Sequence, residues 1–152
     1  MLAMFSIGFS SILNVNTILI ILMGVVLGIL FGASPGLTTS MGMVFMLPLT
    51  FSLSAVNGMA LLSALYIGGT SGGLITAILL NIPGTPASIS TAFDGYPMAQ
   101  RGEAGKALGA GILFSFIGGL FSFMILFILA EPIAKIAVKF TPFDYFGITL
   151  FA

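Results

Sequence analysis

The stretch TILIILMGVVLGILFGASPGLTTS, residues 17–40, decides the fold because it joins an uncharged apolar run to an abrupt Pro-Gly break. The run from Thr17 to Ala33 contains almost only apolar residues and glycine. At ~1.5 Å per residue a helix of this length extends roughly 25 Å, close to the ~30 Å hydrocarbon core of a bilayer. The run therefore predicts the first membrane-spanning helix.

Three glycines of this predicted helix, Gly24, Gly28 and Gly32, follow one another at intervals of four residues. This spacing places them on one face, where a second helix can approach closely because no side chain intervenes. We interpret the stripe as a packing surface rather than as a direct substrate contact.

The composition of the chain points in the same direction. Of its 152 residues 59% are hydrophobic and 5% are charged, and the first 93 residues contain no Asp, Glu, Lys, Arg or His. Too few polar side chains are present to cover a surface that faces water. We therefore expect an all-α, polytopic transmembrane protein that forms a single transmembrane domain over residues 1–152.

The same composition argues against several other functions. The net charge is zero and no basic cluster occurs, so a nucleic-acid partner is not expected. Cysteine and histidine are absent, which removes disulfides, the usual metal ligands and the common nucleophile-base pairs. We expect no enzyme activity, no metal site and no cofactor. Met1–Asn16 lacks the Lys or Arg of a secretory signal, so we expect this segment to be retained.

Residues 41–82 contain three apolar pieces that are each too short to cross a bilayer alone. Met41–Phe51 is interrupted by Pro48, and Ala55–Ile67 is separated from Leu74–Ile82 by the glycine-rich sequence GGTSGG. Such glycines permit either an unwound segment or a tightly packed crossing. We therefore predict broken or re-entrant helices in this region.

Two Pro-Gly breaks share a pattern. When Pro35 is aligned with Pro83, Gly36 falls on Gly84 and Ser40 falls on Ser88. Each break follows an apolar helix. We predict that the segments 35–40 and 83–88 approach one another at mid-membrane and contribute to one site.

A broken membrane helix exposes backbone groups that hydrocarbon cannot satisfy, so the break must line a protein-enclosed or watery cavity. Free N–H groups at a helix start suit a carboxylate, while carbonyl and hydroxyl oxygens suit Na⁺. With no Lys or Arg nearby, full countercharge would have to come from elsewhere. The alternative is that the breaks only kink helices for packing. The candidate binding residues are Gly36, Leu37, Thr38, Thr39, Asn81, Gly84, Thr85 and Ser88.

The remainder of the chain holds all of its charges. Asp94–Lys106 is expected to form a polar loop, and we interpret Asp94-Gly95 as a turn rather than as a proton-carrying carboxylate. Ala107–Ala130 contains no charge and predicts a spanning helix. Glu131, Lys135 and Lys139 lie four residues apart, which is typical of an interfacial amphipathic helix over residues 131–140.

Several motifs, in order between Gly24 and Phe146, resemble one known family. They are GILFGASPGL, AILLNIPGTPAS, DGYPMAQRGEAGKALG and FTPFDYF, and NIPGTP followed by DGYP is the most specific pair. On these motifs the chain is similar to the large membrane subunit of tripartite tricarboxylate transporters, the TctA family.

The resemblance implies a membrane permease subunit of the bacterial cytoplasmic membrane that transports citrate or related small carboxylates. An ion gradient of Na⁺ or H⁺ would drive it, and its partners would be a small membrane subunit and a periplasmic solute-binding protein. The family's subunit is longer and contains two related halves, so this chain resembles an N-terminal part with one of two repeats. The alternative function is a non-transporting membrane scaffold or assembly subunit.

Overall fold

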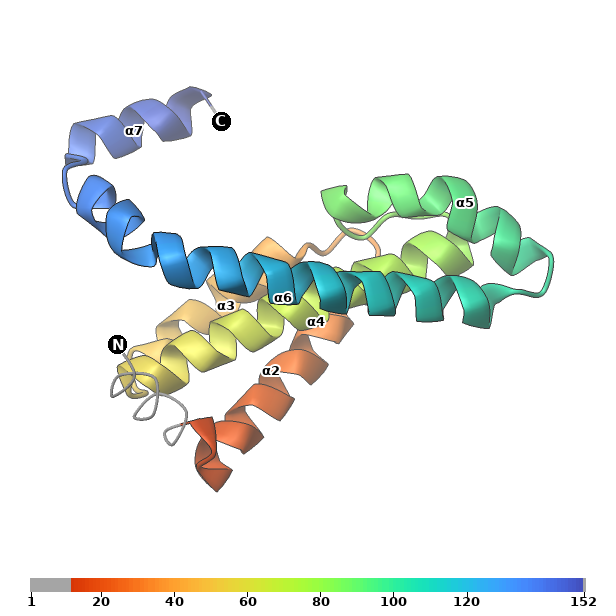
Figure 1. Cartoon of the computed structure of the whole chain (residues 1–152), viewed down its shortest axis with the longest axis horizontal. Coiled ribbons are helices and arrows are strands. Elements are labelled where there is room, and N and C mark those ends of the chain that lie inside the picture. The colour runs from red at the N-terminus through yellow and green to blue at the C-terminus, as the bar shows by residue number, and fades with distance from the viewer. Residues whose placement is uncertain (1–11, 152) are drawn as a thin grey trace. The chain divides into compact units, whose positions relative to one another are not determined.

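The computed structural model describes residues 12–151, and every regular element within that range is helical (Figure 1). The prediction that Met1–Asn16 is retained falls mostly on residues 1–11, outside the described part. By its internal contacts the chain divides into two compact units, Met1–Ile112 and Leu113–Ala152. The elements are α2 (Val15–Ala33), α3 (Thr39–Thr50), α4 (Ala55–Leu80), the 3₁₀ turn η1 (Pro86–Ser88), α5 (Ile89–Gln100), α6 (Ala104–Ala137) and α7 (Pro142–Phe151).

Three helices, α2, α4 and α6, are long and apolar enough to cross a membrane. They contain 19, 26 and 34 residues, whereas the apolar helix α3 contains 12. At ~1.5 Å per residue α3 extends only about 18 Å, which is too short to span. The prediction of an all-α polytopic membrane fold is confirmed.

The predicted interruption of the segment 55–80 is wrong, because α4 continues through the GGTSGG sequence. The four glycines of that sequence are buried against other segments. A helical glycine costs about 1 kcal/mol relative to alanine, but unwinding here would expose backbone groups away from water, at several kcal/mol each. The other interpretation of these glycines, a tightly packed crossing, is confirmed.

Helices α2 and α4 lie against each other (Figure 1), and glycines of both helices form the contact. A Cβ added to Gly28 would lie 2.8 Å from the backbone N of Gly69. A Cβ added to Gly72 would lie 2.6 Å from the carbonyl O of Ile29. The predicted packing role of the Gly24, Gly28 and Gly32 stripe is therefore confirmed.

The other end of α4 packs differently, through aliphatic side chains. Leu74 and Ile78 form a small core with Ala107 at the start of α6, and Met98, Ala99 and Leu108 lie against it. Gly95 allows α5 to approach, because a Cβ there would lie 2.7 Å from Ile78 Cγ1.

The prediction of a polar loop over residues 94–106 is wrong for residues 94–100. Residues 94–100 belong to α5, and Asp94-Gly95 is not a turn. Gly95 serves close packing rather than chain reversal. The chain turns instead at Gly102, where φ is +81°, and Lys106 pairs with Glu103 at 2.7 Å near the start of α6.

Helix α6 continues to Ala137, so residues 131–137 are helical but belong to the long helix that precedes them, and the helix ends before residue 140. Their predicted position at the membrane interface stays a prediction. Pro132 lies inside α6 and does not end it. Glu131 and Lys135 form an i,i+4 ion pair at 2.8 Å that supports the last turns of the helix. Helix α7 begins separately at Pro142, where the N–H and hydroxyl of Thr141 donate to Asp144 Oδ2 at 2.8 and 2.7 Å.

Candidate functional site

The first break, residues 34–38, is a Pro-Gly turn that ends α2. Pro35 occupies the second position, Gly36 adopts φ +87°, and the Leu37 N–H donates to the carbonyl of Ser34 at 3.1 Å. These are the features of a type II turn, which favours proline and glycine at these positions. Helix α3 then starts with Thr38 as its N-cap, whose Oγ1 accepts from the Met41 N–H at 3.2 Å.

The second break, residues 81–85, is built in another way. Asn81 ends α4 in the left-handed conformation, with φ +57°, and its N–H donates to the carbonyl of Thr76. Thr85 precedes η1 and exchanges hydrogen bonds with Ser88. The Thr85 N–H donates to Ser88 Oγ at 3.2 Å, and Ser88 Oγ donates to the Thr85 carbonyl at 2.8 Å.

Two glycines of α4, one helical turn apart, let residues next to the two breaks pack directly on the α4 backbone. A Cβ on Gly69 would overlap the side chain of Thr39, at the start of α3. A Cβ on Gly73 would lie 2.9 Å from Thr85 Cγ2 and 3.0 Å from the Thr85 backbone N. The straight helix α4 therefore serves as the common support on which both breaks are placed.

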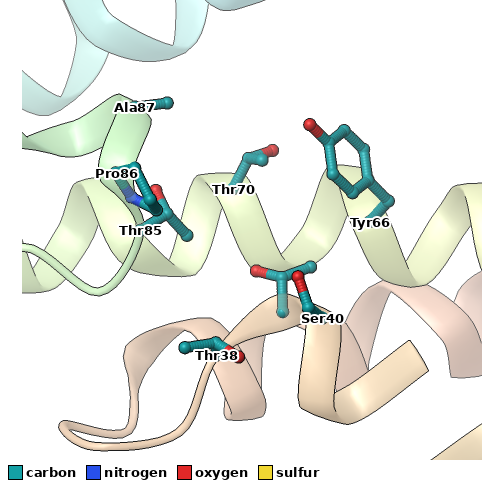
Figure 2. Close-up of a pocket in the computed structure, with 8 residues that line it drawn as sticks. Thr38, Ser40, Tyr66, Thr70, Thr85, Pro86 and Ala87 are labelled. Carbon is teal, nitrogen blue, oxygen red and sulfur yellow. The ribbon is translucent and has the colours of Figure 1, made fainter. Parts of the chain in front are cut away.

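A pocket of about 300 Å³ lies where the two breaks meet α4 (Figure 2). Figure 2 shows Tyr66 and Thr70 rising from the same face of α4, with Thr85 and Pro86 at one end and Ser40 on the adjoining segment. Six of its eight lining residues carry a hydroxyl group, and none is charged. The pocket is lined by Thr38, Thr39, Ser40, Tyr66, Thr70, Thr85, Pro86 and Ala87.

The hydroxyl groups of the residues that line this pocket differ in their hydrogen-bond partners within the chain. Thr70 Oγ1 donates to the Ile67 carbonyl at 2.9 Å, and Thr85 Oγ1 lies 3.3 Å from Ser88 Oγ. The Thr39 hydroxyl is buried and has no hydrogen-bond partner within residues 12–151. The Thr39 side chain packs against Gly69, so α4 covers this hydroxyl and it is not open to the pocket.

Of the eight predicted site residues the structure brings Thr38, Thr39 and Thr85 together around the pocket. Their role in binding stays a prediction. The shared Pro-Gly pattern motivated the pairing of the two segments, and residues of both line this pocket. That they meet at mid-membrane stays a prediction.

The other five predicted residues do not line the pocket. Gly36 and Leu37 belong to the first turn, Asn81 ends α4, and Ser88 is bonded to Thr85. Gly84 is a packing residue, because a Cβ there would contact the carbonyl O of Gly32 and lie 2.9 Å from Gly73 Cα.

Sequence reasoning missed Tyr66 and Thr70 as pocket residues. They lie four residues apart, which places them on one face of a helix. That signal was available only if residues 55–80 were taken as one continuous helix. Because the GGTSGG sequence was interpreted as a possible break, the two side chains were not placed on a common face.

Comparison with known proteins identifies the chain's family. The sequence model of the Tripartite tricarboxylate transporter TctA family matches residues 18–152. The chain belongs to the TctA family. It is also 41% identical over 143 residues to an Agrobacterium vitis protein described as an uncharacterized 52.8 kDa protein in TAR-I ttuC' 3'region. The match covers 94% of this chain and 28% of that protein. No solved structure matches the chain.

Of the motifs by which the sequence resembles the TctA family, one contributes residues to the pocket and another ends just before it. GILFGASPGL contains the end of α2 and the first turn, and AILLNIPGTPAS contains the end of α4, the second break and η1. In this TctA chain AILLNIPGTPAS supplies Thr85, Pro86 and Ala87 to the pocket, and GILFGASPGL ends at Leu37, one residue before the pocket residue Thr38.

Proposed function

We propose that this TctA chain is part of the membrane permease subunit of a tripartite tricarboxylate transporter, and that the pocket between its two breaks binds a small carboxylate. One observation carries the proposal: residues from both helix breaks line a single hydroxyl-rich pocket on α4. Residues far apart in the sequence thus place several hydroxyl groups around one opening, which is the arrangement that a small polar ligand requires.

The size and chemistry of the pocket fit a small carboxylate. Its volume of about 300 Å³ lies at the lower end of the range of roughly 300 to 1,000 Å³ that is usual for small-molecule sites. Hydroxyl groups and the start of α3 offer hydrogen-bond donors to carboxylate oxygens. Since no charged side chain lines the pocket, a cation from the driving gradient, Na⁺ or H⁺, would supply the remaining charge compensation, together with other parts of the complete subunit.

The proposal includes the partners and the location that a tripartite system implies. The subunit would operate in the bacterial cytoplasmic membrane with a small membrane subunit and a periplasmic solute-binding protein. A membrane scaffold, the other function considered, would need no pocket of this kind, because its helices would only have to pack.

Uptake of radiolabelled citrate and succinate tests this function. The complete transporter is reconstituted in vesicles with an imposed Na⁺ or H⁺ gradient and its binding protein. We expect saturable uptake, and Tyr66→Phe should raise the KM about fivefold because one hydrogen bond contributes ~1 kcal/mol. Tyr145→Phe, outside the pocket, is the matched control. Absence of uptake by the parental transporter, with normal assembly, would contradict the proposal.

A further inference from the structure

We infer that the two walls of the pocket enter the membrane from opposite sides, so that each wall separates the ligand from one of the two aqueous compartments. The first wall is the hairpin of α2 and α3, and the second is the segment 81–100, which contains η1 and α5. This inference rests on the proposed transport function. It adds which part of the chain opens the pocket to each side.

Helix α4 provides the scale along which both walls are placed. Its 26 residues extend ~39 Å at ~1.5 Å per residue, enough to cross the ~30 Å hydrocarbon core with some tilt. The pocket residues Tyr66 and Thr70 lie near the middle of this helix. The position of a wall residue along α4 therefore gives its distance from each end of the span.

Both ends of the α2–α3 hairpin lie beside the start of α4. Thr17 Oγ1, near the start of α2, donates to Asn57 Oδ1 at 2.9 Å. At the end of α3, Thr50 Cβ lies 3.3 Å from the position of a Cβ added to Gly58. The hairpin therefore enters and leaves by the same end of α4.

The closed end of this hairpin stops well short of the far end of α4. A Cβ added to Gly72 would lie 2.9 Å from the backbone N of Ala33, the last residue of α2. Residues 73–80 of α4 continue beyond this contact, for about 12 Å. The first wall thus reaches the pocket from one side and ends there.

The second wall reaches the pocket from the other end of α4. After Leu80 the chain runs back along the helix, and a Cβ added to Gly73 would lie 3.0 Å from the Thr85 backbone N. Helix α5 then returns, since a Cβ added to Gly95 would lie 2.7 Å from Ile78 Cγ1. The segment 81–100 therefore dips to the level of Gly73 and leaves by the end at which α4 finishes.

The polar residues at the two ends of α4 agree with this placement. Arg101, Glu103 and Lys106 lie in or beside the turn between α5 and α6, at the end of the unit where α4 finishes. At the start of α4 lie the hydroxyl groups of Ser52 and of the N-cap Ser54. Charged side chains are costly in hydrocarbon, so the turn marks one face of the membrane and the start of α4 marks the other.

Each wall is attached to α4 by few buried residues. In α3 only Thr39 and Gly42 are buried, and in α5 only Gly95, whereas α2 is fixed to α4 by its glycine stripe. Segments with few buried contacts separate at a low free energy. A transported ligand must enter from one side and leave to the other, so α3 and the segment 81–88 lift from α4 in turn.

Beside the pocket each wall rests on one glycine of α4. The Thr39 side chain lies in the space that a Cβ on Gly69 would occupy, and Thr85 lies in the same way over Gly73. Lifting α3 from Gly69 opens the pocket toward the start of α4. Lifting the segment 81–88 from Gly73 opens it toward the end of α4.

Single cysteines in a cysteine-free form of the complete transporter, in oriented vesicles, test this assignment with a membrane-impermeant thiol reagent. Ser52→Cys and Gln100→Cys, both exposed at the outer ends of the walls, should react from opposite compartments. Thr70→Cys is the reporter in the pocket, and its rate is measured from each compartment.

Two alanine variants then displace one wall each. Gly69→Ala crowds Thr39 and should raise the reporter rate roughly tenfold from the compartment that labels position 52. Gly73→Ala crowds Thr85 and should raise it by a similar factor from the compartment that labels position 100. Gly109→Ala, where an added Cβ meets no atom within 4 Å, is the matched control and should change neither rate.

Labelling of positions 52 and 100 from the same compartment would overturn the inference. So would reporter rates that do not change, or that change from the same compartment in both variants, and the transport function would remain intact if parental citrate uptake is normal. If the parental transporter moved no di- or tricarboxylate, the proposed function would be contradicted, and the labelling pattern would still decide how the walls enter. Should an alanine variant fail to assemble, Thr39→Ala or Thr85→Ala replaces it, because losing the contact with α4 frees the same wall.

Discussion

The first break, residues 34–38, and the second, residues 81–85, use the same Pro-Gly pattern to end a helix and then serve different purposes. Gly36 adopts φ +87° with open space around it, whereas Gly84 lacks a positive φ and lies against Gly32 and Gly73. The first glycine is needed for its backbone conformation, and the second is needed for its size. A shared motif therefore marks where a helix ends without defining what each residue does.

The two serines that align in the pattern differ in the same way. Ser40 is exposed and lines the pocket. Ser88 is buried and holds the Thr85 backbone through its hydroxyl. The serine of the first segment leaves its hydroxyl open at the pocket, and the serine of the second uses its hydroxyl to stabilise the break.

The largest expected effect comes from the two aligned glycines. Gly84→Val should destabilise the subunit by more than about 3 kcal/mol and abolish citrate uptake, because its side chain would collide with backbone atoms. Gly36→Ala should cost only about 1 to 2 kcal/mol, the strain of a left-handed residue, and should retain uptake. Thermal unfolding of the purified complete subunit and vesicle uptake measure both. Equal losses for the two variants would show that the glycines play the same role.

The two aligned serines give a smaller contrast. Ser88→Ala should lower the free energy of unfolding by about 1 to 3 kcal/mol, because it leaves the buried Thr85 N–H without its acceptor. Ser40→Ala should leave unfolding almost unchanged, since its hydroxyl is exposed. Chemical or thermal unfolding of both variants provides the comparison. A stability loss in Ser40→Ala as large as that in Ser88→Ala would remove the distinction between an open and a closed break.

The smallest effect is expected for the loss of the ion pair between Glu131 and Lys135, which lies far from both breaks in the sequence. Glu131→Ala removes an exposed ion pair with Lys135, and such pairs contribute about 0.5 kcal/mol or less. Citrate uptake and membrane expression should match those of the parental transporter. Loss of uptake at normal expression would give this surface pair a functional role that the account does not assign.

The positions of the breaks could be predicted because their causes are local. Pro35, Gly36 and Pro83 interrupt apolar runs by their own backbone chemistry, and the stripe from Gly24 to Gly32 needs only helical periodicity. The family resemblance likewise rested on local motifs and is confirmed.

The continuity of α4 could not be predicted from local sequence. Whether the GGTSGG sequence unwinds depends on what covers it, and α2, Thr39 and Thr85 come from other parts of the chain. The error at Gly95 has the same origin, since a glycine beside Asp94 favours a turn until Ile78 is seen to pack on it. Both cases concern glycines whose role is set by a distant neighbour.

The central claim is that the two breaks enclose one carboxylate-binding pocket, and paired cysteines test it most directly. The 152 residues contain no cysteine, so Ser40→Cys and Ala87→Cys can be introduced into a cysteine-free form of the complete subunit. Both residues are exposed and line the pocket. A pair of Ser52→Cys, at the far end of α3, with Ala87→Cys is the control.

We predict that a short bifunctional thiol reagent joins Cys substituted at 40 and 87 but not the control pair, and that saturating citrate slows the reaction at both pocket positions. The account is contradicted if each pocket cysteine reacts with a monofunctional reagent, yet the two are never joined and citrate leaves both rates unchanged.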